Sequence, residues 1–262
     1  MELINYEKMT APQLKMRLSN NAVLLLSFGS IEQHSTHLPL GTDSLCSFKR
    51  AENIARRTGS VLFSPLSVGY SYNHKNMFGT VSLSAETILH VIIEILDQLC
   101  VQGWQRYIIF SGHAGNWSII ESAVQIVRER FPLVQIILSK GLPAIGCEQT
   151  RNRFLKKLDF HAGKIETAIV NYYFPELVDN DNIPPGNNHY PQYLGNFLDK
   201  DYLDIYDELL LRAMIPQNTE SITLYGNWGI ESPSDFSFVP VAEAMQQYED
   251  FFVELIKRWD SM

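Results

Sequence analysis

The chain has 262 residues, and 45% of them are hydrophobic, which is enough for a sizeable buried core and excludes disorder as the main state. Its 21 Lys and Arg residues stand against 29 Asp and Glu, a net charge of -8, so no nucleic-acid partner is expected. The sequence has no apolar stretch long enough to cross a membrane, no export signal and only 3 cysteines, which lie far apart. We therefore expect a cytoplasmic protein with no membrane partner.

The first part of the chain alternates between strand and helix patterns. The apolar run 22–28 is typical of a strand buried on both faces. Helical spacing follows at 43–57, and a short strand is predicted at 61–63. Ser84 is a suitable N-cap for a helix whose apolar positions, within 88–99, recur with the helical period.

The alternation continues beyond Gly103, which ends this helix. We predict a strand at 107–110, a helix from an Asn116 cap to about Arg130, and a strand at 134–138. Short connections between alternating strands and helices favour right-handed crossovers. The sequence therefore predicts an α/β fold with three layers, α/β/α, around a mostly parallel sheet.

The last third of the chain has a different texture. Between 175 and 206 the residues are mainly Asn, Asp, Pro, Gly and Tyr, which predicts a long ordered loop or lid. A closing helix is predicted at 241–259. Because there is no repeat and no domain boundary, residues 1–262 are expected to form a single domain that carries this insertion.

Four side chains of metal-binding type follow the ends of two predicted strands. Glu32, His34 and Asp43 come after the first strand, and His113 comes after the strand at 107–110. The carboxyl ends of parallel strands meet in one crevice, so we expect these side chains to lie together. Carboxylates and imidazoles without thiolates suit Zn²⁺, Mn²⁺ or Fe²⁺, and a carboxylate such as Asp43 can bridge two ions.

Two divalent ions at this place would suit the hydrolysis of an amide at neutral pH. They would lower the pKa of a shared water from about 15.7 toward about 7 and polarise a carbonyl oxygen. A third polar segment, 161–167, begins a predicted helix and carries His161 and Glu166. These two side chains share a face only if His161 lies in the loop before the helix, since they are about one and a half turns apart.

Three segments of the chain resemble motifs of one known family, the creatininase family of creatinine amidohydrolase-like enzymes. The similar segments are Glu32 to Asp43, Gly112-His113-Ala114-Gly115-Asn116, and His161-Ala162-Gly163-Lys164-Ile165-Glu166-Thr167. The similarity runs in order over about residues 20 to 170. Because three separate motifs match, the chain is identified as a member of this family.

The resemblance implies a site with two divalent ions, Zn²⁺ or Mn²⁺, with Fe²⁺ as a further choice. One ion would be held by Glu32, Asp43 and His113, and the second by His34 and the bridging Asp43. Creatininase is expected to supply a glutamate two residues after the motif histidine, where this chain has Gly115. We assign Glu166 as the replacement ligand and as part of the catalytic set. His161 resembles the residue that protonates the leaving nitrogen.

The resemblance also bears on the substrate. Creatininase is expected to carry an aromatic residue directly after the motif histidine, and Ala114 leaves that space empty, so creatinine is not the expected substrate. Other members hydrolyse formamides or trim a peptide, and we predict a small cyclic amide, a formamide or a similar amide. The residues expected to line the substrate are His74, Ser71, Ala114 and Trp117. The family suggests a homo-oligomer, with a hexamer as one form.

Several readings stay open beside this one. His37 is expected to orient a carboxylate ligand, while His74 could serve only the loop structure. Asp43 could instead be an N-cap, and Glu166 an ordinary glutamate at a helix N-terminus. Gly115 and an altered turn near 226–233 also allow a degenerate family member that binds a metabolite or a partner protein.

A phosphoesterase would share the metal-ligand types but is less favoured. Such an enzyme needs cationic side chains to hold phosphate oxygens, and Lys75 and Lys164 are the lysines near the motifs.

Overall fold

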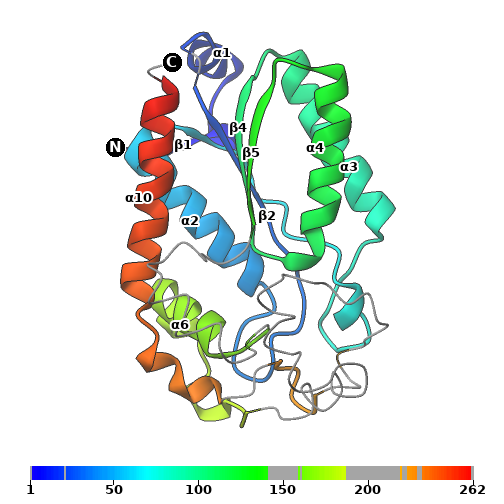
Figure 1. Cartoon of the computed structure of the whole chain (residues 1–262), viewed down its shortest axis with the longest axis vertical. Coiled ribbons are helices and arrows are strands. Elements are labelled where there is room, and N and C mark those ends of the chain that lie inside the picture. Colours follow the sequence, from blue (N-terminus) through cyan, green and yellow to red (C-terminus); the bar gives the residue numbers. More distant parts are fainter. Residues whose placement is uncertain are drawn as a thin grey trace, which may run out of the picture.

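The computed structural model describes residues 2–20, 22–140, 159, 161–186, 219, 223–228 and 232–260. In this part of the chain, parallel strands form a five-stranded sheet in the order β1-β3-β2-β4-β5. Their bounds are Ile4–Asn5 for β1, Leu24–Phe28 for β2, Val61–Leu62 for β3, Arg106–Ser111 for β4 and Gln135–Lys140 for β5. The strands β2 and β4 lie side by side, in a register that pairs Phe28 with Ser111 (Figure 1).

Helices cover both faces of the sheet, so the predicted three-layer α/β/α fold is confirmed (Figure 1). One face carries α1 (Ala11–Ser19), α3 (Ala85–Val101) and α4 (Trp117–Arg130). The opposite face carries α2 (Thr42–Thr58) and α10 (Val241–Asp260). Each helix packs an apolar stripe against the sheet and leaves its polar side to solvent.

Alternation along β2 divides the core between the two faces. Leu24, Leu26 and Phe28 belong to the cluster that contains α3 and α4. Val23 and Leu25 belong to the cluster that contains α2 and α10. Successive side chains of a strand point to opposite faces, so a strand covered on both sides is mainly apolar. This is why the sequence of this strand lacks polar alternation. Its one polar residue, Ser27, is buried and forms a hydrogen bond with the Ser47 hydroxyl at 2.9 Å.

The predicted helix boundaries agree with the structure at α3 but not in the capping of α4. The Ser84 hydroxyl accepts a hydrogen bond from the Thr87 N–H at 3.1 Å, as an N-cap should. Asn116 occupies the N-cap position of α4, but its side chain makes no capping bond. It bridges two loops instead, as described below. The elements β1 and α1 were not predicted, because β1 has only two residues and α1 buries none.

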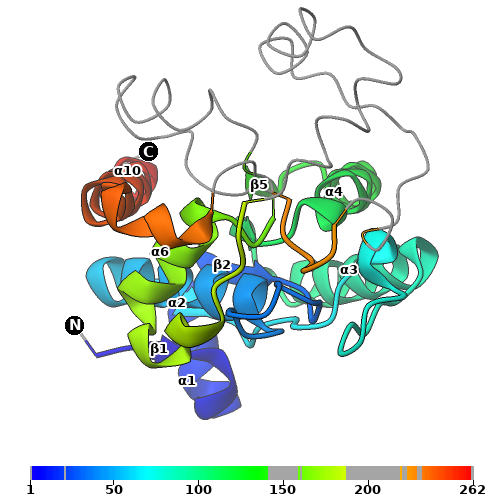
Figure 2. The ribbon, with the colours of Figure 1, turned by 90° about the horizontal axis from the view of Figure 1, so that it is seen from below.

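A short helix, α6 (Lys164–Tyr173), lies on the side of the sheet that carries α2 and α10 (Figure 2). It packs through a third apolar cluster, which includes Leu38, Ile169, Val170 and Met245. Beyond it the chain forms two 3-10 turns, Pro175–Leu177 and Asn180–Asn182. Residues 187–206 of the predicted loop or lid lie outside the described residues.

In the described part of the chain, no helix is both long and apolar enough to span a membrane.

Candidate metal centre

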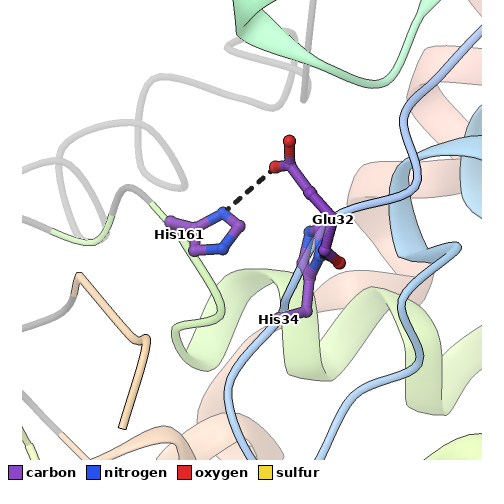
Figure 3. Close-up of side chains that lie close together, drawn as sticks. All are labelled: Glu32, His34 and His161. Carbon is purple, nitrogen blue, oxygen red and sulfur yellow. Dashed lines mark hydrogen bonds and ion pairs between the residues drawn. The ribbon is translucent and has the colours of Figure 1, made fainter. Parts of the chain in front are cut away.

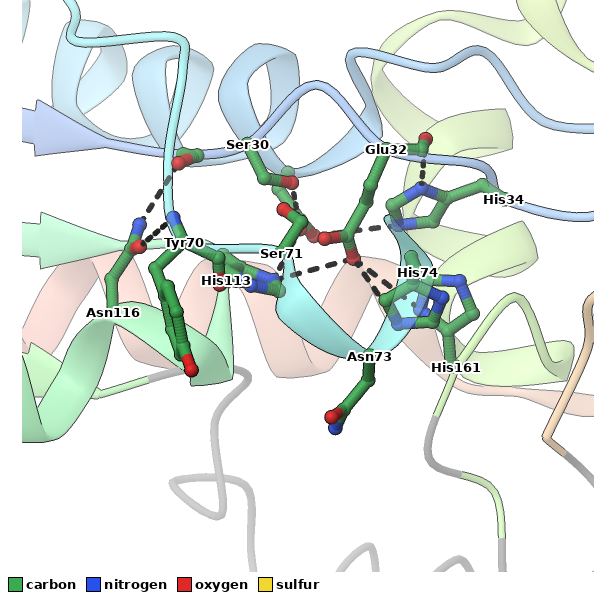
Figure 4. Close-up of polar contacts among 12 residues, drawn as sticks. Ser30, Glu32, His34, Tyr70, Ser71, Asn73, His74, His113, Asn116 and His161 are labelled. Carbon is green, nitrogen blue, oxygen red and sulfur yellow. Dashed lines mark hydrogen bonds and ion pairs between the residues drawn. The ribbon is translucent and has the colours of Figure 1, made fainter. Parts of the chain in front are cut away.

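The loops that follow β2 and β4 carry the predicted ligands to one place. Glu32 and His34 lie beyond the end of β2, and His113 lies beyond the end of β4 (Figure 4). Asp43 enters from the first turn of α2, whose N-cap is Gly41, so Asp43 is not the N-cap. The neighbouring positions of β2 and β4 in the sheet therefore bring together residues that are far apart in the sequence.

One group of three possible ligands consists of Glu32, Asp43 and His113. The Nδ1 atom of His113 lies 3.3 Å from Glu32 Oε1 and 3.1 Å from Asp43 Oδ2. The Nε2 atom of His113 lies 2.8 Å from the main-chain oxygen of Tyr70, to which it donates its hydrogen. When the ring is neutral, this bond leaves Nδ1 as the lone-pair atom that faces the carboxylates. Glu32 and Asp43 raise the pKa of His113 against the effect of burial, so an ion at this place would take the position of a proton on Nδ1.

A second group consists of His34, Asp43 and Glu166. The Nε2 atom of His34 lies 3.5 Å from Asp43 Oδ1 and 3.8 Å from Glu166 Oε2. The Nδ1–H of His34 donates to the main-chain oxygen of Glu32 at 3.1 Å, so Nε2 is free to act as a ligand. The two oxygens of Asp43 thus face different histidines, which is the arrangement that a bridging carboxylate requires.

Glu166 lies in the first turn of α6, and His161 lies in the loop before this helix. The Oε2 atom of Glu166 accepts a hydrogen bond from the Ala162 N–H at 2.6 Å. Ala162 has a φ of 47°, a left-handed conformation that turns the loop back toward the helix. This agrees with the expectation from the sequence that His161 and Glu166 can face one site only if His161 lies in the loop before the helix.

Unpaired buried atoms support the fit of a divalent cation. Within the described part of the chain, both carboxylate oxygens of Glu32 and the Nε2 atom of His34 are buried and make no hydrogen bond. Buried polar atoms are almost always paired, because an unpaired one costs about 1–3 kcal/mol. Carboxylate oxygens and imidazole nitrogens that face one another need a positive charge between them. The donor set is the one expected for Zn²⁺ or Mn²⁺.

The pKa values of these groups reflect the same demand for positive charge. Burial disfavours charge on His34, but the carboxylates of Asp43, Glu166 and Glu32 together outweigh burial and raise the pKa of His34 to about 10. Burial also opposes ionisation of Glu32, but His113 lowers the pKa of this carboxyl to about 2. Burial raises the pKa of Glu166 to about 7. Bound cations would replace the protons that His34 and Glu166 otherwise retain.

His161 and His74 complete the wall of the site. The Nδ1 atom of His161 lies 3.7 Å from Glu32 Oε1 (Figure 3), and the Nε2 atom of His74 lies 3.8 Å from the same oxygen. The two imidazole rings lie 4.2 Å apart between their centres. Burial lowers the pKa of both rings, to about 4 for His74, so both are neutral at pH 7. His161 also forms a third possible ligand group with Glu32 and His34.

The other residues predicted to line or support the site differ in how far they are buried. The Nε2 atom of His37 lies 2.8 Å from the Thr167 hydroxyl, so this histidine contacts α6 next to Glu166 rather than a carboxylate. Ser71 is buried, and its hydroxyl has no hydrogen bond in the described part of the chain. Ala114 is exposed and Trp117 is half-buried, and both follow His113 in the sequence.

Sequence reasoning missed two residues that hold the ligands in place. The Ser30 hydroxyl donates to Asp43 Oδ2 at 2.6 Å. The main-chain oxygen of Tyr70 fixes the tautomer of His113, and Asn116 holds Tyr70 by accepting its N–H at 2.9 Å. The Nδ2 atom of Asn116 also donates to the Gly29 carbonyl at 2.9 Å. No sequence pattern marks a main-chain acceptor, although Asn116 belonged to a recognised motif.

Gly115 stands where the family resemblance suggested a missing glutamate. A Cβ atom placed there would lie 2.4 Å from His113 Nε2 and 2.4 Å from the Tyr70 oxygen. The backbone at this position is packed against the hydrogen bond that orients His113. A side chain at 115 is therefore excluded for a local steric reason, whatever supplies the last ligand.

The altered C-terminal turn also contacts this region. Gly226 has a φ of 87°, which favours glycine, and its carbonyl oxygen lies 3.0 Å from the side-chain nitrogen of Gln33. The Trp228 N–H donates to the main-chain oxygen of His161 at 2.7 Å. The residues 229–231 of this turn lie outside the described part.

Comparison with known proteins gives a family and a fold. A family model described as "Creatininase: Creatinine amidohydrolase" matches residues 7–237. The chain is 28% identical to a creatinine amidohydrolase of Pseudomonas putida over 67% of its length and 74% of the relative. It is 25% identical to a 3-dehydro-scyllo-inosose hydrolase of Thermotoga maritima over 68% of its length. It is 29% identical to a mycofactocin precursor peptide peptidase of Mycobacterium ulcerans over 63% of its length.

The matched segments cover 58% of the Thermotoga maritima relative and 63% of the Mycobacterium ulcerans relative, less than two thirds of either protein. Solved structures are similar over nearly the whole chain. A crystal structure of creatinine amidohydrolase has a TM-score of 0.77 at 17% identity and covers 98% of this chain and 99% of its own. A structure described as "Creatininase Mn" has a TM-score of 0.75 at 17% identity, with 97% and 99% covered.

Proposed function

The chain belongs to the creatininase family, whose matched relatives include hydrolases, and we propose that it is a metal-dependent amidohydrolase. Its substrate is a small cyclic amide, a formamide or a similar amide, in which it hydrolyses a C–N bond. The observation that carries this proposal is the pair of ligand groups that share Asp43. A peptidase among the relatives keeps a short peptide among the candidate amides.

The donor atoms assign the ions to two positions. Glu32, His113 and one oxygen of Asp43 would hold the first ion, and His34, Glu166 and the other oxygen of Asp43 the second. When bound, divalent ions supply a water of lowered pKa and a Lewis acid for a carbonyl oxygen. Zn²⁺ and Mn²⁺ are proposed because the ligands suit them and because solved relatives are described as zinc and manganese forms.

The protein's own residues handle the protons of the reaction. His161 is neutral, its Nε2–H is 2.7 Å from the Gln33 main-chain oxygen, and its Nδ1 faces the ligands. Nδ1 therefore accepts a proton from the attacking water and returns it to the leaving nitrogen. His74 and the unpaired Ser71 hydroxyl offer donors to a substrate oxygen, and Ala114 leaves room beside His113. Trp117 lines the substrate from the start of α4.

Two measurements test the proposal. Protein purified without chelator is expected to contain about two equivalents of transition metal, as a shared-carboxylate site requires. It is then assayed against creatinine, lactams, formamides and short peptides, with the chelator-treated protein as control. Hydrolysis of at least one amide by the metal-loaded protein only is the expected result. Less than half an equivalent of metal, with no binding on titration, would sink the proposal.

The second candidate is a degenerate family member that binds a metabolite or partner protein through the same pocket. Gly115, in the place of an expected glutamate, favours it. This candidate predicts metal binding with no hydrolysis of any amide in the panel. We further propose a homo-oligomer, which sedimentation of the metal-loaded protein tests.

A further inference from the structure

Gln33 lies between two proposed ligands in the sequence, and its side chain contacts two histidines of the site that are not assigned to an ion, His74 and His161. It is 5% exposed. The Ser35 N–H donates to Gln33 Oε1 at 3.0 Å, which identifies the other end of the amide as the nitrogen. Ser35 adopts a left-handed φ of 62°, and a backbone in this region is held by its surroundings. The orientation of the Gln33 amide is therefore fixed.

The amide nitrogen of Gln33 determines where His74 carries its proton. It donates to the Gly226 carbonyl at 3.0 Å and lies 2.9 Å from His74 Nδ1. An amide nitrogen can only donate, so His74 Nδ1 must accept and the ring proton must be on Nε2. The Thr219 hydroxyl lies 2.7 Å from the same Nδ1 and 2.9 Å from the Asn73 main-chain oxygen, and its single hydrogen can go to only one of these two acceptors. The amide of Gln33 is therefore the donor that determines the His74 tautomer. The Nε2–H of His74 therefore points toward Glu32 Oε1.

The main-chain oxygen of Gln33 determines which nitrogen of His161 carries the proton. It lies 2.7 Å from His161 Nε2, and a carbonyl oxygen can only accept, so this nitrogen must carry the proton. The amide nitrogen of Gln33 is also near, at 3.1 Å, but two donors cannot form a hydrogen bond with each other. His161 Nδ1 is left as a lone pair, 3.7 Å from Glu32 Oε1.

We propose that Gln33 is a positioning residue that makes His74 a hydrogen-bond donor and His161 an acceptor at the same edge of the site. Both rings are protonated on Nε2, but they present opposite atoms to Glu32, Nε2–H from His74 and bare Nδ1 from His161. The bond to Gly226 also ties the turn 223–228 to this pair. The consequence for catalysis rests on the proposed function, whereas the proton positions do not.

The test is the Gln33→Glu variant with ¹⁵N-histidine labelling. A carboxylate oxygen would replace the amide donor, so His74 is expected to move its proton to Nδ1, while His161 keeps its proton on Nε2 because its main-chain partner is unchanged. Long-range ¹H–¹⁵N spectra report each tautomer, with and without Zn²⁺, and His74→Gln and His161→Gln spectra assign the signals. Gln125→Glu, an exposed change on α4, is the matched control.

The expected result is an Nε2–H tautomer of His74 in the parent and the Gln125 control, and an Nδ1–H tautomer in Gln33→Glu. An Nδ1–H tautomer in the parent, or the same tautomer in parent and variant, overturns the inference. If Gln33→Glu does not fold, Gln33→Met removes the donor without adding charge. A mixture of both tautomers is then expected, and a single unchanged Nε2–H tautomer overturns the inference.

Activity separates this inference from the proposed function. Where the parent hydrolyses an amide, Gln33→Glu is expected to lower kcat by about 10–100-fold, the usual effect of removing a group that orients active-site histidines or ligands, with unchanged zinc content. If the parent hydrolyses nothing but shows the expected tautomers, the proposed function fails and this inference stands. If kcat is unchanged while the tautomer moves, the assigned roles of His74 and His161 in the reaction are overturned.

Discussion

The His113 ring donates its Nε2–H to the Tyr70 carbonyl oxygen at 2.8 Å, and through this one bond it turns Nδ1 toward Glu32 and Asp43. The chain around the bond has no space for a further side chain, because position 115 lies directly against both atoms. The hydrogen bond between His113 and Tyr70 therefore both excludes a side chain at position 115 and directs Nδ1 of His113, the proposed ligand atom, toward the carboxylates.

Replacing Gly115 with glutamate is expected to damage the site rather than restore a ligand. The new Cβ would displace His113 or Tyr70, and overpacking of this kind costs about 1–3 kcal/mol of unfolding free energy. Thermal denaturation and metal analysis check both effects. The Gly115→Ala variant, which adds the Cβ alone, should lose a similar amount. If Gly115→Glu in a Glu166→Gln background regained full metal content, the steric argument would be wrong.

The Glu166→Gln substitution is expected to remove one ion. An amide oxygen is a much weaker ligand than a carboxylate, and Glu166 belongs to only one of the two ligand groups that share Asp43. Metal content should fall from about two equivalents to about one, with loss of hydrolysis. Glu129→Gln, an exposed change on α4, is the matched control. Unchanged stoichiometry would mean that Glu166 is not a ligand and would favour the degenerate member.

The stability of the chelator-treated protein is expected to fall as the pH rises. The pKa of His34 is raised to about 10 and that of Glu166 to about 7. A group whose pKa is raised on folding contributes stability that is complete below its ordinary pKa and is lost as the pH passes the raised value. Below about pH 6.5 the lowered pKa values of His37, His74 and His161 act in the opposite direction, because these rings take up protons on unfolding. Unfolding free energy should therefore decline between about pH 7 and pH 10, as urea titrations at several pH values measure.

Zinc is expected to reverse this trend, because metal binding requires deprotonated ligands and strengthens as the pH rises. The difference in stability between zinc-loaded and chelator-treated protein should widen from pH 6 to pH 9. The His34→Gln variant should flatten the upper part of the decline, while a change at His90, exposed on α3, should leave it unaltered. A pH-independent stability of the chelator-treated parent contradicts the prediction.

Asn116→Ala is expected to lower the unfolding free energy by about 2–4 kcal/mol, because it leaves the Tyr70 N–H and the Gly29 carbonyl without their partner. Asn116→Asp keeps an acceptor for Tyr70 but cannot donate to Gly29, so about half of the loss should remain. Urea denaturation measures both, with Ser118→Ala, an exposed change on the same helix, as control. Equal stability of Asn116→Ala and the parent would show that the bridge between the two loops is unimportant.

The sequence predicted the sheet and its covering helices well because their signals are local. The strand β2 is buried throughout and apolar except for Ser27, α3 has a helical period and a Ser84 cap, and each pattern is complete within one element. The edge strand β1 has only two residues and carries no such pattern. Helix α1 begins with a capping box of Thr10 and Gln13, but it buries none of its residues, so it has no apolar stripe to indicate it. The place of β1 at the edge of the sheet becomes evident only in the structure, where Ile4 pairs with Val61 of β3.

The candidate site was predictable only in its list of residues. Polar side chains at the ends of β2 and β4 indicated a shared crevice, and the register of these strands explains why they meet. The orientation of each ring depends on main-chain carbonyls of Glu32, Gln33 and Tyr70, which every residue possesses. Composition and spacing cannot indicate them. Asn116 was predicted to be a helix cap because its actual role, a bridge between two distant loops, leaves no local pattern in the sequence.

The proposed ligands come from different layers of the fold. Glu32 and His113 stand on loops of the central sheet, whereas Glu166 stands on α6, which packs through its own apolar cluster against α2 and α10. An ion held by Glu166 together with His34 and Asp43 would act as a cross-link between α6 and the loop and helix that follow β2. Metal occupancy and local opening of α6 are then thermodynamically linked, so amide hydrogen exchange in this helix becomes a reporter of how firmly the second ion is held.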